Sequence, residues 1–478
     1  MSWPFGSGRK KNNPSAPLDP EGHRLIGLTL KGNQPIRAPK GHSLLLSAAG
    51  GGKSTAGGMS WLFSYAASEP HKAVLYLDSK SGEAAWQAAD MLASLGRKVA
   101  IINDMGVLPA DCPHRVSLNP FGAAVHAAKH NPETLLYAID NITHVAVPEP
   151  AEPDERNRYF RAWPRNFCDG GLRVLLKRNT ALATPGGLWA LLSDPDKLKR
   201  FAAIEAEEGD ESLKALARAI LGMTGHEHWP QHLEAAQSSM RIFSAGTKLH
   251  NVGIGATTTH EELIRQGAII FLVGPQAYIN KLGPYYALHL MAFIDALYRG
   301  AGALRIIADE FTNAPLKSLV ESLTTLRAFG CEVHMIAQSR SEIERKFGRL
   351  ETQTIEENAI VKQWFGFSSF DEAERVSKAM GEEQAVSRTL GADSETLRLQ
   401  TNLQLNRQRT MSSAELMAMP SHLQLVHVKG LGFFLARKLG QQNIAPYCHL
   451  VADNPLEGGK LPPNPIVTLT TSTKGATS

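Results

Sequence analysis

One stretch of the chain has the residue types and the spacing to hold phosphate groups. It runs from Ser47 to Thr55 and reads SAAGGGKST. Consecutive glycines let a backbone approach a phosphate without a Cβ, and N–H groups at the start of a helix attract anions. The stretch fits the P-loop pattern GxxxxGK[ST], except that Ser47 stands where the pattern has its first glycine. We predict a nucleotide-binding loop; the alternative is a glycine-rich turn in front of a helix.

The residues of this loop have separate predicted roles. Backbone N–H groups from Gly50 to Lys53 would cradle the phosphates, and the Lys53 ammonium would reach the β- and γ-phosphates. The Ser54 hydroxyl would bind Mg²⁺. The predicted nucleotide-binding set is Ala49, Gly50, Gly51, Gly52, Lys53, Ser54 and Thr55. ATP and Mg²⁺ are accordingly the ligands that we expect.

A P-loop enzyme also needs an acidic strand end, and the chain has one at Asp309 and Glu310. Both follow the apolar run 304–308. Asp309 would hold Mg²⁺ through water, and Glu310 would polarise the attacking water as a general base. Apolar strands that end in two acids also occur by chance, so it is the upstream Lys53 that favours the catalytic interpretation.

Two further side chains are candidates for contact with the γ-phosphate. Gln338 follows the apolar run 331–336, where it could sense the phosphate from a neighbouring strand; the alternative is a polar residue at a strand end. Arg327 precedes that run and could act in trans, as an arginine finger across a subunit interface. Its alternative is an ordinary arginine in a salt bridge on a helix.

The elements that must position these residues alternate between strands and helices. Apolar runs predict buried strands at 43–46, 73–78, 98–102, 268–273, 304–308 and 331–336. Helical patterns lie between them, at 53–68, at 84–95 and up to Tyr298. This alternation predicts an α/β fold with a doubly wound, mostly parallel sheet. The apolar run 285–298 is too short to span a membrane and predicts a buried core helix.

The rhythm changes in the middle of the chain, where helical patterns dominate. We therefore predict a flexible arm over 1–22, a nucleotide-binding domain formed by 23–122 and 238–453, an all-α insertion domain over 123–237, and a disordered tail over 454–478.

Composition sets few further bounds. The 478 residues suggest two or three domains, and a net charge of +4 permits nucleic-acid binding without demonstrating it. The four cysteines are far apart, which favours reduced thiols over a disulfide framework.

The order of the motifs resembles a known family. The chain carries Asp309-Glu310-Phe311, then Leu326-Arg327-Ala328-Phe329-Gly330, then Ala337-Gln338-Ser339, then Phe347-Gly348. This order is similar to the C-terminal half of type IV secretion coupling proteins, the TraG/TraD-like conjugative ATPases. Residues 78–83 resemble the D-x-K-G-E box of that family with one extra residue, and 118–121 resemble its N-P-L/F turn. Residues 411–420 resemble its closing L-x-x-x-E-L-x-x-L-P box.

The resemblance implies a RecA-like motor domain that carries an all-α domain and assembles as a homohexameric ring. ATP would sit between subunits, where Arg327 would complete a neighbour's site. Family members couple ATP hydrolysis to moving single-stranded DNA, or protein attached to it, into a membrane secretion channel. The implied partners are single-stranded DNA with a relaxase, or a secreted protein, and membrane-embedded components of the secretion system.

The chain departs from the family at its start. Family members usually begin with transmembrane helices, whereas about 46 residues precede the P-loop here and none of them forms a spanning segment. We therefore expect a cytoplasmic chain without a transmembrane segment, held at the bacterial inner membrane through a partner; the alternatives are a soluble variant and a shortened form of a longer protein.

Two other functions remain open. A chromosomal DNA translocase or DNA-processing ATPase would share the core, but such proteins generally carry a DNA-reading module at one end, and the tail after Asn454 is too short for one. A non-catalytic adaptor would bind nucleotide for assembly and dock secreted proteins. The presence of Lys53, Asp309 and Glu310 together favours the motor over the adaptor.

Overall fold

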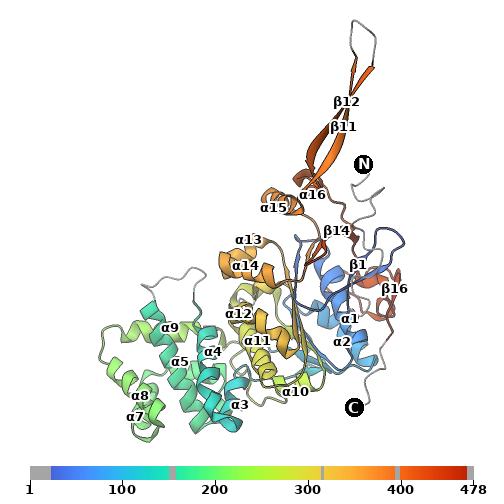
Figure 1. Cartoon of the computed structure of the whole chain (residues 1–478). Coiled ribbons are helices and arrows are strands. Elements are labelled where there is room, and N and C mark those ends of the chain that lie inside the picture. Colours follow the sequence, from blue (N-terminus) through green and yellow to red (C-terminus); the bar gives the residue numbers. More distant parts are fainter. Residues whose placement is uncertain (1–22, 150–157, 314–316, 393–398, 471–478) are drawn as a thin grey trace.

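A twelve-stranded sheet forms the centre of the molecule (Figure 1). The computed structural model describes residues 23–149, 158–313, 317–392 and 399–470. The strands of this sheet are β1 (Arg24–Leu28), β2 (Pro35–Ala38), β3 (Ser43–Leu46), β4 (Ala73–Asp78), β5 (Val99–Ile102), β6 (Arg115–Val116), β7 (Ile269–Val273), β8 (Leu304–Ala308), β9 (Cys331–Ala337), β10 (Val361–Trp364), β13 (Leu423–Val428) and β14 (Gly432–Arg437).

The sheet has a parallel part and an antiparallel part. Its order is β2-β1-β14-β13-β10-β3-β9-β8-β4-β7-β5-β6. Every neighbouring pair from β10 to β6 is parallel, whereas the pairs from β2 to β10 are antiparallel. Each predicted buried strand is present in the parallel part, which confirms the doubly wound α/β fold. The antiparallel extension is an addition that the strand–helix rhythm did not predict.

Helices cover both faces of the parallel part, so its strands are buried on both sides. One face carries α1 (Met59–Ser68), α2 (Glu83–Ser94) and α17 (Tyr447–Leu450), and the other carries α10 (His260–Arg265), α11 (Gly283–Tyr298), α12 (Lys317–Leu326), α13 (Arg340–Phe347) and α14 (Arg349–Asn358). Strand β7, for example, is buried at every residue, as expected for a parallel strand between two helical layers. We call the edge where the parallel strands end the carboxyl edge, and the opposite edge the amino edge.

A block of helices fills the middle of the chain, as the sequence predicts. It comprises α3 (Gly122–His130), α4 (Leu135–Ala146), α5 (Arg158–Arg178), α6 (Pro185–Leu192), α7 (Pro195–Glu208), α8 (Glu211–Met223) and α9 (Trp229–Ser239). The described residues between 122 and 239 contain no strand. Helix α4 packs on α11, and one apolar cluster joins Ile139 and Ile142 of the block to Phe293 of α11. The block, green to teal in Figure 1, therefore shares a core with one face of the sheet.

The chain leaves and re-enters the sheet region at two adjacent points. Ser117, just after β6, donates its backbone N–H to Thr257 Oγ1 at 3.1 Å. Thr257 in turn donates its backbone N–H to the Ser117 carbonyl at 3.0 Å. The two connections to the helical block are thus hydrogen-bonded to each other.

A long hairpin projects from the body beyond α15 (Phe370–Met380) and α16 (Ser413–Met417), as Figure 1 shows. Its strands β11 (Glu382–Ala392) and β12 (Leu399–Arg409) pair antiparallel along their whole length. At its base Arg409 Nη1 lies 2.7 Å from Glu374 Oε2 of α15. This hairpin was not predicted, because its strands pair only with each other and lack the long apolar runs that mark the central sheet.

The predicted disorder of the C-terminal segment is wrong for the part that the structure describes. Within 454–470, β16 (Val467–Thr468) pairs with β15 (Ile444–Ala445), and Asn454 Nδ2 donates to Glu83 Oε1 at 2.5 Å. Val467 and Leu469 are also buried in the apolar cluster beneath α1 and α2, so pairing and apolar packing together hold the segment. Residues 471–478, like the predicted flexible arm 1–22, lie outside the described residues.

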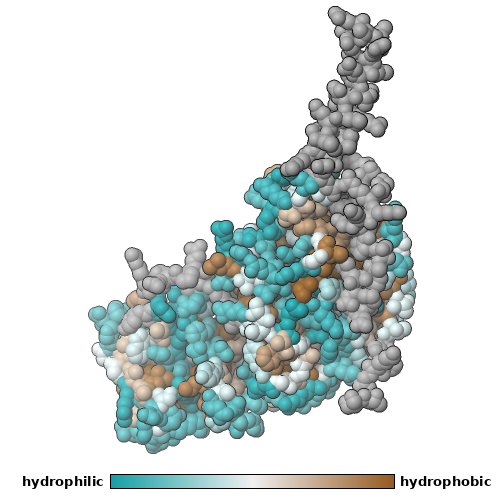
Figure 2. Space-filling view, in the orientation of Figure 1, coloured by the Kyte–Doolittle hydropathy of each residue, from teal (hydrophilic) through white to brown (hydrophobic). Residues whose placement is uncertain are grey.

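Among the described residues no helix is both long enough and apolar enough to cross a membrane. Helix α11, which carries the apolar run 285–298, is instead buried along almost its whole length, as predicted. The face seen in Figure 2 is mostly hydrophilic, with small separate apolar areas. All four cysteines belong to the described part of the chain and all are free thiols, as predicted.

Candidate nucleotide-binding site

The predicted nucleotide-binding loop connects β3 to a helix at the carboxyl edge. The helix starts with a π-helical turn, η1 (Lys53–Gly58), which continues directly into α1. Gly52 caps it with φ 84°, a left-handed conformation that strongly favours glycine. Ser47, the departure from the usual pattern, explains another glycine: a Cβ added at Gly51 would collide with Ser47 Oγ. The glycine run therefore suits both the turn and the serine that precedes it.

Three of the predicted catalytic side chains meet at this edge. Lys53 Nζ lies 2.5 Å from Glu310 Oε1, and both side chains are nearly buried. Gln338 Nε2 donates to Glu310 Oε2 at 3.4 Å. The sheet order explains the meeting, because β9 lies between β3 and β8 and the three strands end side by side.

Glu310 occupies an unfavourable backbone conformation. Its φ is 57°, which is rare for a residue other than glycine and costs on the order of 1–3 kcal/mol. The carboxylate is held toward Lys53 and Gln338 from this position. Strain of this kind is found mainly at sites that bind or react with a ligand.

The two predicted metal ligands also lie together. Ser54 Oγ donates to Asp309 Oδ2 at 2.9 Å. Tyr76 OH donates to the same oxygen at 3.5 Å, and burial followed by the Asp309 charge raises the pKa of Tyr76 well above its usual value. Asp309 Oδ1 is buried and has no hydrogen-bond partner among the described residues.

This arrangement fits Mg²⁺, which prefers oxygen ligands and usually keeps several waters and substrate phosphates in its shell. Ser54 and Asp309 would hold the ion, and the free Oδ1 of Asp309 supplies an acceptor for a metal-bound water. When bound, the ion would neutralise charge on the phosphates. A site made by protein side chains alone is not found: the described residues contain no group of three or more His, Cys, Asp or Glu side chains suited to a metal.

Lys80 is a charged neighbour that was not among the predicted site residues. Its Nζ donates to Ser54 Oγ at 2.5 Å and lies 3.6 Å from Asp309 Oδ2. Burial lowers the pKa of Lys80, but the charges of Asp309, Glu310 and Glu83 outweigh burial and raise it overall. The D-x-K-G-E-like box could have indicated Lys80 from the sequence, because it places a lysine just after β4.

The first acid of that box has a structural role. Asp78 Oδ2 accepts a hydrogen bond from the Ala85 N–H in the first turn of α2, at 2.8 Å. Burial raises the pKa of Asp78 to about 7. Asp78 therefore stabilises the start of α2.

Lys438 contacts the loop from the antiparallel part of the sheet. Its Nζ donates to the carbonyls of Gly51 at 3.0 Å and Phe365 at 2.8 Å. It also lies over the Phe365 ring, and burial lowers the pKa of Lys438 to about 8. Lys438 thus connects β14 with the glycine run, a contact that the sequence motif could not reveal.

Arg327 is the predicted site residue that the structure does not bring to the loop. It begins the turn η8 (Arg327–Phe329) before β9, at the amino edge, while Gln338 follows the other end of β9. Its side chain is exposed and makes no ion pair with any described residue. Arg327 is therefore not an arginine held in a salt bridge by other described residues. It also lies at the opposite edge of the sheet from the P-loop of its own chain. A role in trans remains a prediction.

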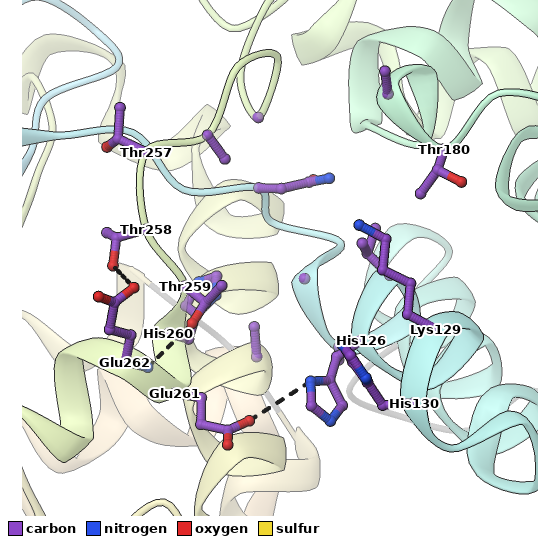
Figure 3. Close-up of a pocket in the computed structure, with 18 of the residues that line it drawn as sticks. His126, Lys129, His130, Thr180, Thr257, Thr258, Thr259, His260, Glu261 and Glu262 are labelled. Atoms are coloured by element: carbon purple, nitrogen blue, oxygen red, sulfur yellow. Dashed lines mark hydrogen bonds and ion pairs between the residues drawn. The ribbon is translucent and has the colours of Figure 1, made fainter.

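A separate cavity of about 570 Å³ lies where the helical block meets the sheet region (Figure 3). Figure 3 shows His126 of α3 pointing toward Glu261 of α10, with Nδ1 and Oε2 3.7 Å apart. Glu261 also pairs with Arg265 and Arg299, at 2.5 and 3.2 Å. The lining of the cavity includes no residue of the P-loop. These contacts join the block to α10 and α11.

Comparisons with known proteins agree with the motif order. Residues 303–421 match the family model described as the TraM recognition site of TraD and TraG. The chain has no match among curated proteins.

Solved structures of one protein share the fold. The unbound monoclinic form of bacterial conjugative coupling protein TrwBdeltaN70 has a TM-score of 0.63 at 15% identity, over 87% of this chain and 88% of that one. Plasmid coupling protein TrwB in complex with ADP and Mg²⁺ has a TM-score of 0.61 at 15% identity, over 87% and 90%. TrwB in complex with a non-hydrolysable ATP analogue has a TM-score of 0.61 at 16% identity, with the same coverage.

The shared fold is RecA-like, with a P-loop and an all-α part. Together with the match of 303–421, it confirms the resemblance to type IV secretion coupling proteins.

Proposed function

We propose that this chain is the ATP-driven coupling motor of a type IV secretion or conjugation system. It would recruit a relaxase–DNA complex or a protein substrate and move it toward the membrane channel. The observation that carries the proposal is the convergence of Lys53, Asp309, Glu310 and Gln338 at the carboxyl edge of a coupling-protein fold.

The contacts suggest how the residues divide the work. Lys53, now paired with Glu310, would exchange that partner for the β- and γ-phosphates. Glu310 would then be free to take a proton from the attacking water, while Gln338 keeps the carboxylate oriented through Oε2. TrwB binds ADP with Mg²⁺ and an ATP analogue, which supports ATP as the substrate here.

Assembly and partners belong to the same proposal. Arg327 is exposed at the amino edge, so it could reach a nucleotide only on another copy of the chain, as in a homohexameric ring. The matched family model describes TraM recognition by TraD and TraG, which supports contact of 303–421 with a component of the DNA-processing complex. We further propose that a membrane-embedded partner holds the chain at the bacterial inner membrane.

ATP hydrolysis tests the proposal directly. We expect activity that single-stranded DNA stimulates, and a loss on the order of 10²-fold or more in Lys53→Ala and in Glu310→Gln, since each removes a group that acts on the reacting phosphate or water. Lys98→Ala is the matched control, because Lys98 is exposed and lies outside the site.

The outcomes separate the alternatives. Activity that is absent, or that survives both substitutions, would contradict the motor and favour a nucleotide-binding adaptor. Activity that double-stranded DNA stimulates more strongly than single-stranded DNA would favour a translocase with the same core.

A further inference from the structure

Lys80 reaches the carboxyl edge from the side opposite to the P-loop lysine. It lies in the turn after β4, and β4 pairs with β8, the strand that Asp309 directly follows. Its ammonium contacts Ser54 Oγ at 2.5 Å and Asp309 Oδ2 at 3.6 Å. The side chain is 20% exposed, so it has a path to solvent.

The two groups that Lys80 contacts are the two that fit Mg²⁺. The Ser54 hydroxyl donates its proton to Asp309 and accepts a hydrogen bond from Lys80, so both of its functions are in use. An ammonium and a divalent cation at the same two oxygens would repel each other strongly, because like charges so close together are only weakly screened in a nearly buried site. Lys80 and the metal therefore exclude each other from this position.

The lysine satisfies the position only partly. Asp309 Oδ1 remains buried without a hydrogen-bond partner in the described part of the chain. A buried carboxylate oxygen usually finds a partner, because leaving it unpaired is costly. The oxygens around Asp309 thus suit a cation that makes more contacts than the Lys80 ammonium does.

We propose that Lys80 is a built-in counter-ion that occupies the Mg²⁺ position in the nucleotide-free protein and leaves it when Mg²⁺ arrives with the nucleotide. This inference rests on the proposed nucleotide site. It assigns Lys80 a positioning role: it keeps Ser54 and Asp309 in place, and it makes the free protein insensitive to Mg²⁺ alone. Metal binding then depends on the nucleotide, whose phosphates supply the ligands that displace the ammonium.

Thermal unfolding without nucleotide tests this competition. MgCl₂ is titrated into wild type, Lys80→Met, Lys80→Gln and Lys80→Arg, with Lys98→Met as the control for loss of an exposed lysine. We expect no rise in Tm for wild type, Lys80→Arg and the control over the millimolar range. Lys80→Met and Lys80→Gln should be less stable than wild type in EDTA and should regain stability at millimolar Mg²⁺ concentrations that leave the Tm of wild type unchanged.

A second substitution identifies the site of the response. Asp309→Asn in the Lys80→Met background should abolish the Mg²⁺ response, because it removes the charge that both cations share. A purely structural loss in Lys80→Met would lower Tm in EDTA and in Mg²⁺ alike. That result, or a wild-type response as strong as that of Lys80→Met, would overturn the inference; if Lys80→Met does not fold, Lys80→Gln gives the same readout.

Nucleotide binding in the same samples keeps this test separate from the proposed function. Binding of a fluorescent ATP analogue in Mg²⁺, lost in Lys53→Ala, would show that the nucleotide site is real whatever Lys80 does. No binding to any variant would contradict the proposed function itself and would remove the premise for Lys80.

Discussion

The two edges of the central sheet both bury charged side chains, but they satisfy them differently. At the amino edge Arg305 donates to both carboxylate oxygens of Glu69, at 2.8 and 3.1 Å, and lies 3.3 Å from Glu332. At the carboxyl edge Lys53 and Lys80 each reach one carboxylate, and Asp309 keeps a buried oxygen unpaired among the described residues.

The difference separates an ion cluster that serves folding from one that serves a ligand. At the amino edge Arg305, Glu69 and Glu332 pair their charges with one another inside the chain. The carboxyl-edge cluster includes a strained residue, Glu310, and an unsatisfied oxygen. Features of this kind cost stability and persist where a bound group makes use of them.

The largest expected effect concerns Arg327, which shares the amino edge but not its ion cluster. In the assembled protein, Arg327→Ala should lower ATP hydrolysis on the order of 10³-fold, as expected for an arginine finger. Nucleotide affinity and Tm should stay unchanged, because the side chain is exposed and has no ion-pair partner in the described part. Steady-state rates and nucleotide titrations measure the two, with Arg241→Ala as the exposed control. Equal loss in a dilute monomer would argue against action in trans.

Arg305 should give the next largest effect, on folding. Arg305→Ala leaves Glu332 buried without its cation and Glu69 still paired with Lys72, and breaking a buried ion pair typically costs about 3–5 kcal/mol. The urea midpoint should fall, while nucleotide affinity measured well below that midpoint should remain. Lys378→Ala, which removes an exposed ion pair with Glu374, should change the midpoint little. If Arg305→Ala instead lost nucleotide binding with an unchanged midpoint, the division between the edges would be wrong.

The smallest effects should appear in the pH dependence of stability, with opposite signs at the two edges. Burial raises the pKa of Asp78 at the carboxyl edge to about 7. The contribution of Asp78 to folding stability is therefore complete below its pKa in the unfolded chain, and it is lost as the pH rises through 7. Burial also opposes ionisation of Glu69, but Arg305 and Lys72 outweigh it and lower the pKa of Glu69. The contribution of Glu69 to folding stability is present above its pKa in the unfolded chain, and it is lost as the pH falls through its lower pKa in the folded protein.

Two variants separate these contributions. Asp78→Asn should remove the fall in stability that wild type shows as the pH rises from 4 to 8. Glu69→Gln should flatten only the acid side of the profile, on top of a uniform destabilisation. Tm measured from pH 3 to 8 shows both slopes. A wild-type slope that persists in Asp78→Asn above pH 5 would mean that another group titrates there.

The sequence predicted those parts of the site that depend on local pattern. The P-loop lies between a strand and a helix, and Asp309, Glu310 and Gln338 follow buried strands, so parallel pairing brings them to one edge. Their catalytic and metal-binding roles remain predictions.

Other parts depend on contacts that local pattern does not encode. Lys80 and Lys438 reach the P-loop from β4 and β14, and only the strand order and the length of each side chain reveal where they end. The β11–β12 hairpin was missed for a related reason: its strands pair with each other alone, so the apolar runs that identify core strands are absent.

The paired connections at Ser117 and Thr257 have an evolutionary consequence. The segment between them begins and ends at points one hydrogen bond apart, at the β6 end of the sheet and away from the P-loop strand β3. A segment with adjacent ends can be lengthened, trimmed or exchanged without altering the register of the strands on either side. The helical block can therefore diversify between lineages while the residues at the carboxyl edge stay fixed.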